Sequence, residues 1–286
     1  MKKNDLKKKF VLGTANFTQK YGVKSTKVNL VEIKKILSLA KKNNLNTLDT
    51  ADSYLNDVSI FKYTKKRFKL ISKIKPDDKW IDFEHCRNEL DDQITKLNTK
   101  IEILLFHDVK IFFSKYGTKI FNNLKILKKY GYFKKIGFSI YNPDCLEYLT
   151  SKYDFNVVQC PYNILDKRII STGWLGKLKQ KGIEVHVRSI FLQGLLVNKK
   201  ISKKKYFEKW ESKFSEWFKY LKSCKISPIE YSLNDLLEHD FDRIIIGINS
   251  YDNLKEIINF KIIKNKNKMI NFKIKNLRLI DPRKWN

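Results

Sequence analysis

Short apolar segments alternate with longer, lysine-rich segments along the whole chain. Eight of the short segments are rich in β-branched residues and predict strands at Phe10–Ala15, Asn46–Thr50, Phe68–Ile74, Ile101–His107, Lys135–Ile140, Asn156–Pro161, Ile183–Ile190 and Arg243–Ile248. Between them apolar residues recur at helical spacing, most clearly at 30–42 and 124–130. Because strands that are apolar throughout are buried on both faces, this alternation predicts a parallel sheet covered by helices. Eight such units without a linker predict an α/β fold, a single (β/α)8 TIM barrel domain over residues 1–286 with its core at about 10–258.

Two segments exceed what a minimal barrel needs. Lys203–Cys224, between the seventh and eighth predicted strands, carries aromatic and aliphatic residues at helical spacing. It predicts an extra helical segment packed on the barrel, with a lid over the substrate pocket as the alternative. The tail after Phe260 is strongly basic and ends in the residues 281–285, Asp-Pro-Arg-Lys-Trp. Its pattern predicts no role.

Composition narrows the class of protein. Apolar residues make up 42% of the chain and aromatic residues 13%, enough for a packed interior, so disorder is not expected. No apolar run approaches the roughly 18 residues that cross a bilayer, and the apolar stretch near the amino end is too short for a signal peptide. The four cysteines lie far apart with no CxxC pair, which is typical of buried thiols in a reducing cytoplasm.

The net charge of +29 raises the question of a polyanionic partner. Only seven of the 59 basic residues are arginine, and the lysines are spread along the whole chain. Surfaces that grip phosphates or read bases usually favour arginine, with its bidentate fork, beside aromatic stacking platforms. The charge therefore indicates solvated helix faces rather than a nucleic-acid site, with a polyanion-binding surface as the alternative. An anionic substrate would still be attracted by this field.

In a barrel of this kind the active site lies at the carboxyl ends of the strands. Polar residues stand at consecutive strand ends: Asp49 (with Tyr54 five residues further on), Lys73, His107, Ser139, Gln159 and Arg188. Each has a structural alternative, with Asp49 as a helix cap, His107 as a hydrogen-bonded core residue and Lys73 as an exposed cation. Their occurrence on consecutive strands favours a common site.

The set fits the reduction of a carbonyl group, which needs a hydride donor and an acid beside the oxygen that gains negative charge. Tyrosine has a reference pKa of about 10, and a nearby lysine ammonium group lowers it. Lys73 would act on Tyr54 in this way, with Asp49 holding the lysine charged and His107 donating to the substrate oxygen. No GxSxG elbow, HExxH motif or His/Cys cluster points to a nucleophile or a metal.

The same residues lie in motifs that resemble those of the aldo-keto reductases. Residues 48–54, Leu-Asp-Thr-Ala-Asp-Ser-Tyr, are similar to the family's Asp-Thr-Ala-x-x-Tyr signature, and residues 71–73 and 104–107 to its lysine and histidine strands. Further similar motifs follow at 137–139, 158–163, 192–196 and 245–250, so the resemblance spans about residues 10–258. It implies an NAD(P)H-dependent oxidoreductase that reduces an aldehyde, ketone or sugar carbonyl. The implied catalytic tetrad is Asp49, Tyr54, Lys73 and His107, with Tyr54 as the general acid.

The resemblance also implies a nicotinamide cofactor, usually NADPH, bound without a Rossmann domain. In agreement, none of the ten glycines forms GxGxxG. The implied cofactor residues are Gly13, Thr14 and Ala15 near the nicotinamide ribose, Ser139 and Gln159 at the carboxamide, Arg188 and Ser189 at the nicotinamide, Leu192 and Gly194 along the diphosphate, and Gly247, Asn249, Asn253 and Glu256 at the adenosine half.

Three positions depart from the family pattern. Ile140 stands where an asparagine commonly follows the carboxamide-binding serine, and Arg188 replaces an aromatic residue that stacks on the nicotinamide. A guanidinium plane can also stack. Asn249, with Lys255 nearby, stands where relatives that prefer NADPH often carry a cation against the 2′-phosphate. NADP is therefore the expected cofactor, with NAD as the alternative.

Residues 187–194 and the ending at 281–285 resemble a bacterial branch of the family that is associated with surface-carbohydrate pathways. That likeness implies a small-molecule carbonyl substrate of the sugar or nucleotide-sugar class. No membrane partner is expected, because no apolar run is long enough to cross a bilayer. The main alternative is a non-catalytic barrel that acts as a cofactor-sensing or scaffolding subunit. Retention of all four tetrad residues argues against it.

Overall fold

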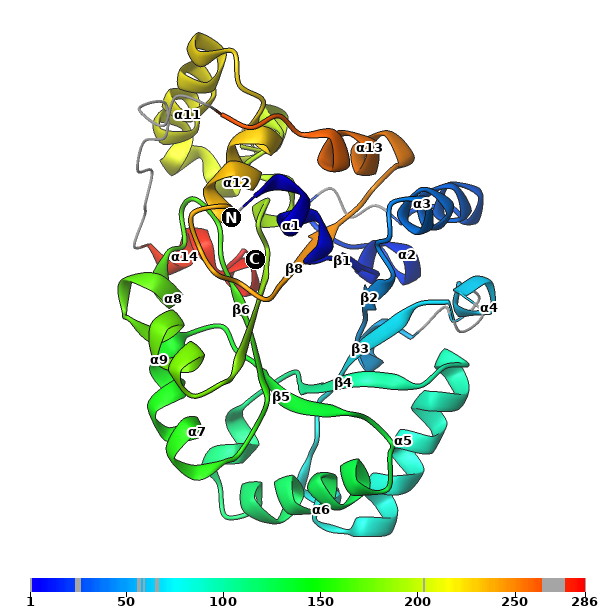
Figure 1. Ribbon diagram of the computed structural model, residues 1–286. Helices are drawn as coiled ribbons and strands as arrows, with labels where there is room; N and C mark the ends of the chain where they lie inside the picture. Colours follow the sequence, from blue (N-terminus) through cyan, green and yellow to red (C-terminus); the bar gives the residue numbers. More distant parts are fainter. Residues whose placement is uncertain are drawn as a thin grey trace.

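The computed structural model describes residues 2–23, 27–55, 58, 60–64, 67–202, 204–263 and 276–285. Eight parallel strands form a closed barrel in sequence order, and β8 pairs with β1 to close it (Figure 1). The strands are β1 (Phe10–Gly13), β2 (Thr47–Asp49), β3 (Lys69–Ile74), β4 (Ile101–Phe106), β5 (Lys135–Ser139), β6 (Val157–Pro161), β7 (Glu184–Arg188) and β8 (Arg243–Gly247). The predicted TIM barrel and all eight strands are confirmed, with differences of one or two residues at the strand ends.

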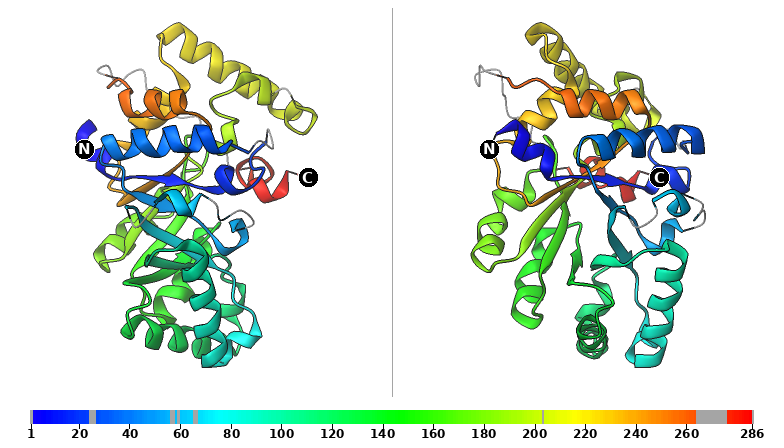
Figure 2. Two further views of the ribbon diagram at one scale, coloured as in Figure 1. Left: turned by 90° about the vertical axis from the view of Figure 1, so that its right-hand side faces the viewer. Right: turned by 45° about the vertical axis from the view of Figure 1, so that its right-hand side comes forward.

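Helices surround the barrel, as the turned views in Figure 2 show. The outer layer comprises α3 (Leu30–Lys42), α5 (Phe83–Leu97), α6 (Gly117–Lys129), α7 (Leu146–Lys152), α8 (Arg168–Ser171), α9 (Trp174–Gln180), α12 (Pro228–Leu236) and α13 (Tyr251–Asn259). In α3 the Asn29 side chain caps the first turn by accepting a hydrogen bond from Glu32 N at 2.9 Å. Its apolar face, predicted from the spacing, is buried at Ile33, Ile36, Leu37 and Ala40. Within the described part of the chain, no helix combines the length and apolar character required to cross a membrane.

Short helices occupy many of the connections. They are α1 (Lys3–Lys8), α2 (Ala15–Thr18), α4 (Phe61–Thr64) and the 3-10 helices η1 (Asp52–Tyr54), η2 (Asp78–Ile81), η3 (Lys110–Phe113), η4 (Pro143–Cys145) and η5 (Leu192–Gly194). Six of them, α2, η1, η2, η3, η4 and η5, begin within four residues after the carboxyl end of a strand. Local helical structure therefore shapes the start of most loops at this end of the barrel.

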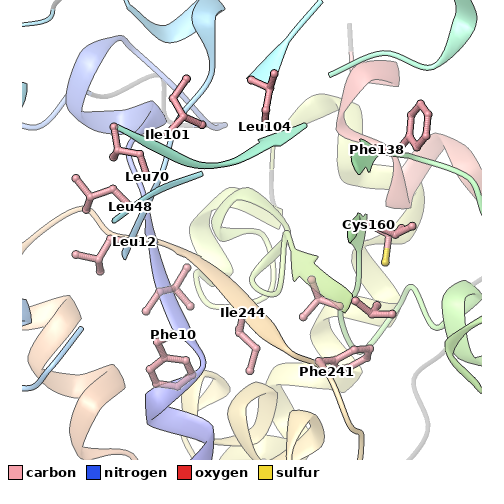
Figure 3. Packing of buried hydrophobic residues seen from close by; sticks show 14 of the residues in the cluster. Phe10, Leu12, Leu48, Leu70, Ile101, Leu104, Phe138, Cys160, Phe241 and Ile244 are labelled. Carbon is pink, nitrogen blue, oxygen red and sulfur yellow. The ribbon is translucent and has the colours of Figure 1, made fainter. Parts of the chain in front are cut away.

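Alternate side chains of each strand face opposite sides of the barrel wall. Outward-facing residues such as Phe10, Leu12 and Leu48 belong to a buried layer between the strands and the helices (Figure 3). The residues between them face the barrel interior, where a separate apolar cluster contains Val11, Ile71, Ile103, Leu105, Val157 and Ile245. This interior cluster separates the two ends of the barrel.

A polar group lies at the amino ends of β5 and β7. Glu184 is the register partner of the interior residue Val157, so its side chain also faces inward. Lys135 and Glu184 form an ion pair, and His186 Nε2 lies 3.1 Å from Glu184 Oε2. The amino end of the barrel thus contains a lysine, a carboxylate and a buried histidine that bond to one another.

The extra helical segment between β7 and β8 is confirmed and comprises α10 (Lys199–Ser202), η6 (Lys205–Trp210) and α11 (Glu211–Cys224). Lys203 lies outside the described residues. The apolar face of α11 is buried in a second cluster, hereafter the outer cluster, together with Leu192, Leu195 and Leu196. Trp217 Nε1 donates a 3.0 Å hydrogen bond to the Leu196 carbonyl oxygen. The segment therefore packs against the loop that follows β7.

The C-terminal segment, residues 276–285, packs on the same outer cluster. It forms α14 (Leu277–Ile280) and the 3-10 helix η8 (Pro282–Lys284), and Leu279 and Ile280 are buried. The Trp285 ring meets Phe207 edge to face, with centroids 4.9 Å apart, and its Nε1 donates to the Leu279 carbonyl oxygen at 2.9 Å. Residues 264–275 of the basic tail lie outside the described residues. The end of the chain is thus anchored near the loop after β7.

Candidate active site

The alternation that buries apolar residues inside the barrel also directs the strand-end side chains inward. Lys73 comes two residues after the interior Ile71 in β3. Gln159 likewise comes two residues after Val157 in β6. Side chains two residues apart on a strand share a face. The side chains of Lys73 and Gln159 therefore also face the barrel interior, nearer to its carboxyl end. There Gln159 Nε2 donates a 2.8 Å hydrogen bond to Asp49 Oδ2 at the end of β2.

Asp49 and Lys73 form a buried ion pair at the centre of this end of the barrel. Lys73 Nζ donates to Asp49 Oδ1 and, at 3.1 Å, to the Thr50 carbonyl oxygen. With Gln159 on Oδ2, both carboxylate oxygens accept hydrogen bonds. Burial lowers the pKa of Lys73, while the Asp49 carboxylate opposes this shift by favouring the ammonium form. The carboxylate thus fixes the position of Lys73 and favours its charge.

Tyr54 stands at the end of η1, the turn that follows β2. Its ring meets His107 edge to face, with centroids 5.9 Å apart, and lies 6.4 Å from the Tyr21 ring centroid. Burial raises the pKa of Tyr54 above its ordinary value of 10, and the positive charge of Arg188 acts in the opposite direction. The shift is opposite to the lowering predicted from the sequence, because desolvation of the phenolate, together with Tyr21 and the Asp49 carboxylate, outweighs the positive charge of Arg188. Tyr54 is therefore a protonated phenol near neutral pH, the form that can donate a proton.

His107 follows β4, and its backbone N donates a 2.7 Å hydrogen bond to the Ile74 carbonyl oxygen. Burial, together with the positive charges of Lys73 and Arg188, lowers the pKa of His107 to about 4. The imidazole is therefore neutral near pH 7 and can donate one hydrogen bond. Its contact with Tyr54 brings two neutral donors together, an arrangement suited to the oxygen of a carbonyl group.

Two cavities meet at these residues. The first, of about 220 Å³, is lined by all four predicted catalytic residues and extends along the loops after β1, β7 and β8. The second, of about 480 Å³, also reaches Lys73 and His107. It extends along the loops after β2, β3, β4 and β5 and reaches the C-terminal segment. Tyr141 lines both cavities. The predicted tetrad therefore lines the first cavity, and its members Lys73 and His107 lie where the two cavities join.

Most of the predicted cofactor residues line the first cavity: Gly13, Thr14, Ala15, Arg188, Ser189, Gly194, Gly247, Asn249 and Asn253. Ser139 lines the second cavity. Gln159, Leu192 and Glu256 line neither of the two. Gln159 contacts Asp49, Leu192 is buried in the outer cluster, and Glu256 is exposed on α13.

Ser139 and Gln159 are the residues whose geometry fits a nicotinamide carboxamide. They are register partners on β5 and β6, and both are buried. Ser139 Oγ and Gln159 Oε1 have no hydrogen-bond partner among the described residues. Buried polar atoms are nearly always paired, so an adjacent unpaired donor and acceptor is the pattern expected where a ligand binds. The serine hydroxyl matches a carboxamide oxygen, and the glutamine oxygen matches a carboxamide NH₂ group.

The loop after β7 holds left-handed backbone conformations beside the first cavity. Ser189, Leu192 and Gln193 have φ of 62°, 46° and 51°, and Gly194 follows with φ of 90°. A non-glycine residue in this region costs free energy and persists where the surroundings impose it, often at functional sites. Ser189 and Gln193 line the first cavity, so part of the strain lies on the wall where a cofactor would bind.

Sequence reasoning missed several cavity residues. Asn16 and Tyr21 line the first cavity from the loop after β1, and Asn16 Nδ2 donates to Asn249 Oδ1. Neither stands at a strand end, and no pattern in that loop singles them out. Tyr141 does follow directly on the predicted strand that ends at Ile140, and that position was a signal which could have identified it.

Arg188, the residue expected at the nicotinamide, stacks on a protein ring. Its guanidinium carbon lies 4.1 Å from the ring centroid of Tyr141, and Nη2 donates to the Ile140 carbonyl oxygen at 3.2 Å. The guanidinium carbon of Arg283, from the C-terminal segment, lies 3.5 Å from the same centroid. Tyr141 thus links β7 to the end of the chain through two cation–π contacts.

Known proteins similar to this chain share its fold and sequence pattern. The model described as the Aldo/keto reductase family matches residues 9–271. The structure is similar to that of the aldo-keto reductase AKR11C1 from Bacillus halodurans in its holo form, with a TM-score of 0.72, 17% identity, and coverage of 92% of this chain and 90% of that chain. It is also similar to the glycerol dehydrogenase AKR11B4 from Gluconobacter oxydans, with a TM-score of 0.67, 16% identity, and coverage of 96% and 92%. At these identities the structural likeness shows the fold. No curated protein sequence matches the chain.

Proposed function

Because the chain belongs to the aldo/keto reductase family, whose reaction is the NAD(P)H-dependent reduction of a carbonyl group, we propose that Tyr54 is its proton donor. Lys73, Asp49 and His107 assist it. The observation that carries this proposal is the convergence of the four side chains on the first cavity, where Lys73 and His107 also line the second. One cavity has room along the loops of β1, β7 and β8 for a cofactor, and the other opens towards the remaining loops for a substrate.

The residues of the chain bind, orient and protonate the substrate, while the reduced nicotinamide supplies the hydride when bound. The Tyr54 hydroxyl and the neutral His107 ring donate hydrogen bonds to the carbonyl oxygen and polarise it. As the carbonyl carbon gains the hydride, the π electrons move onto the oxygen. That oxygen takes the proton from Tyr54, which leaves an alcohol and a tyrosine phenolate. Solvent then returns a proton to Tyr54.

Lys73 stabilises the phenolate formed in this step. Burial makes the phenolate costly, as the raised pKa of Tyr54 indicates, so a positive charge nearby must offset part of that cost. Lys73 is held at the centre of the site by Asp49 and the Thr50 carbonyl oxygen. Such a fixed charge needs no reorganisation when the negative charge develops, which is the condition for effective electrostatic catalysis.

NADPH is the proposed cofactor, with NADH as a weaker alternative. Ser139 and Gln159 would hold the carboxamide through the two unpaired atoms described above. Gly247, Asn249 and Asn253 line the first cavity at the end proposed for adenosine. Gln159, Leu192 and Glu256 line neither cavity. Gln159 enters the proposal through its unpaired Oε1, whereas Leu192 and Glu256 carry no weight in it.

A sugar or nucleotide-sugar carbonyl is the proposed substrate class. The second cavity is lined by Asp52, Ser53 and Asn142, whose polar side chains can bond hydroxyl groups.

The four cysteines are free thiols, which supports the proposal that the enzyme works in the reducing cytoplasm.

Two measurements test the function. Fluorescence titration with NADPH measures cofactor binding, and a turnover screen with NADPH and a panel of aldehydes, ketones, sugars and nucleotide sugars measures reduction. We expect binding and turnover of at least one class. Binding without turnover across the panel would favour a cofactor-sensing subunit, and the absence of NADPH binding would contradict the proposal.

A further inference from the structure

Arg283 lines the second cavity although it comes from the C-terminal segment, far in sequence from the catalytic strands. Its orientation is fixed by two contacts. The guanidinium carbon lies 3.5 Å from the ring centroid of Tyr141, and Nε and Nη2 donate to the two carboxylate oxygens of Asp281 at 2.9 and 2.7 Å. Asp281 itself is buried, so this pairing is partly shielded from water. The result is a pre-oriented guanidinium group at the cavity wall.

These contacts leave part of the guanidinium group free. Arginine carries five N–H groups in a rigid fork. Asp281 occupies the edge formed by Nε and Nη2, and Nη1 has no hydrogen-bond partner in the part of the chain that the structure describes. The remaining edge, Nη1 with the outer N–H of Nη2, has the geometry for a second bidentate acceptor. The side chain of Arg283 is 54% exposed, so a ligand can reach that edge.

Two ion pairs present their cations to the second cavity. The loops around it contribute Lys75, Lys110, Asp52 and Asp108, whose charges sum to zero. The other charged groups that line the cavity are Lys73 and Arg283, whose carboxylate partners Asp49 and Asp281 do not line it. A substrate in the cavity can therefore contact the cation of each pair and not its carboxylate.

We propose that Arg283 binds an anionic group of the substrate, a carboxylate or a phosphate, while the carbonyl group lies against Tyr54 and His107. The proposal rests on the proposed function, because it assigns the second cavity to the substrate. His107 and Arg283 line the same cavity of about 480 Å³, so one small molecule can reach both. The enzyme then selects oxo acids or sugar phosphates over neutral carbonyl compounds of the same chain length.

A purely structural role for Arg283 makes a different prediction. In that case its only task would be to neutralise the buried Asp281, and its loss would lower stability without changing selectivity. The tail has other anchors, since Leu279 and Ile280 are buried and Trp285 Nε1 donates to the Leu279 carbonyl oxygen. Selectivity between charged and neutral substrates therefore separates the two roles.

The experiment compares substrate pairs that differ in one anionic group: 4-oxobutanoate with butanal, and glyceraldehyde 3-phosphate with glyceraldehyde. The measured quantity is the ratio of kcat/KM for the charged member to that for the neutral member. For Arg283→Gln we expect this ratio to fall by about ten- to a hundredfold in at least one pair, the size of a lost charge-assisted contact. Arg278→Gln is the matched control, since it removes the same charge from an exposed position in the same segment. Its ratio should stay near that of the wild type.

Three further readouts keep the proposal testable. The double variant Asp281→Asn with Arg283→Gln leaves no buried carboxylate unpaired. It should lose the same selectivity, and it replaces Arg283→Gln as the test if that single variant folds poorly. Equilibrium binding of succinate and inorganic phosphate should weaken in Arg283→Gln but not in Arg278→Gln, whether or not a substrate is turned over. An unchanged ratio with unchanged anion binding, or equal losses in both arginine variants, would overturn the proposal. Failure of the proposed function looks different, because then no compound is reduced although anion binding still depends on Arg283.

Discussion

The two ends of the barrel contain the same kinds of side chain, yet only one has the properties of an active site. At the carboxyl end Lys73 pairs with Asp49, and His107 lies nearby. At the amino end Lys135 pairs with Glu184, and His186 lies 3.1 Å from that carboxylate. The polar cluster at each end arises because ionisable residues occupy positions on the parallel strands, or directly after them, whose side chains face the barrel interior.

The difference between the ends lies in the space beside the polar groups. At the amino end the lysine and the carboxylate bond to each other, His186 Nδ1 is buried without a partner among the described residues, and neither of the two cavities around the tetrad extends there. At the carboxyl end Ser139 Oγ and Gln159 Oε1 are buried without partners among the described residues, and two cavities join. Residue types and unpaired polar atoms alone therefore do not identify a site. Accessible space beside them does, and the known preference of barrels for sites at this end agrees.

Among the variants that compare the two ends of the barrel, removing Lys73 should give the largest effect. Lys73→Met is expected to lower kcat by at least about 10²-fold, because the phenolate of Tyr54 loses its fixed positive charge. It also leaves the Asp49 carboxylate buried without a cation, at a cost of about 3–5 kcal/mol in the free energy of unfolding. The residual activity should shift its pH dependence upward, since a phenol without a neighbouring cation has a higher pKa.

The double variant Asp49→Asn with Lys73→Met separates the two effects. It removes both charges, so chemical denaturation should show much of the lost stability restored, while kcat stays low. Recovery of kcat together with stability would mean that the pair serves the fold rather than the reaction.

The amino end should respond in the opposite way. Glu184→Gln is expected to lower the free energy of unfolding at pH 7 by about 1.5–3 kcal/mol through lost charge-assisted hydrogen bonds, and to leave kcat and KM nearly unchanged. His186 and Lys135 lower the pKa of Glu184 to about 2 from an ordinary value of 4.5. The wild type should therefore keep this contribution above pH 4.5 and lose it as the pH falls towards 2, whereas the variant should not. Denaturation curves at several pH values measure the difference, and a large fall in kcat would contradict the separation between the ends.

Cofactor selectivity is expected to change least. Asn249 lines the first cavity and brings no charge to a 2′-phosphate, so the wild type should prefer NADPH over NADH by less than about 100-fold, and less at high salt. Asn249→Arg should raise the preference by about tenfold, or about 1.4 kcal/mol. The measurement is the Kd of each protein for NADPH and NADH at low and high salt. A strong preference of the wild type for NADPH that salt does not change would reveal another phosphate-binding group.

Much of the barrel and of the tetrad could be predicted because both depend on local sequence. The strands are continuous apolar runs, and Lys73 and His107 end two of them. Arg283 could not be recognised as a cavity residue, because its position depends on how the C-terminal segment packs on the outer cluster. The raised pKa of Tyr54 also could not be predicted, since it depends on burial rather than on the nearest cation. The assignment of residues 1–286 to one domain and the individual cofactor contacts stay predictions.

The central claim is that Tyr54 gives its proton to the carbonyl oxygen, and one variant tests it most directly. Tyr54→Phe removes the hydroxyl and keeps the ring that contacts His107. Single-turnover reduction of the best substrate by the NADPH-loaded variant should be slower by about 10²–10⁴-fold, with the Kd for NADPH close to that of the wild type. Reduction at the wild-type rate would contradict the account.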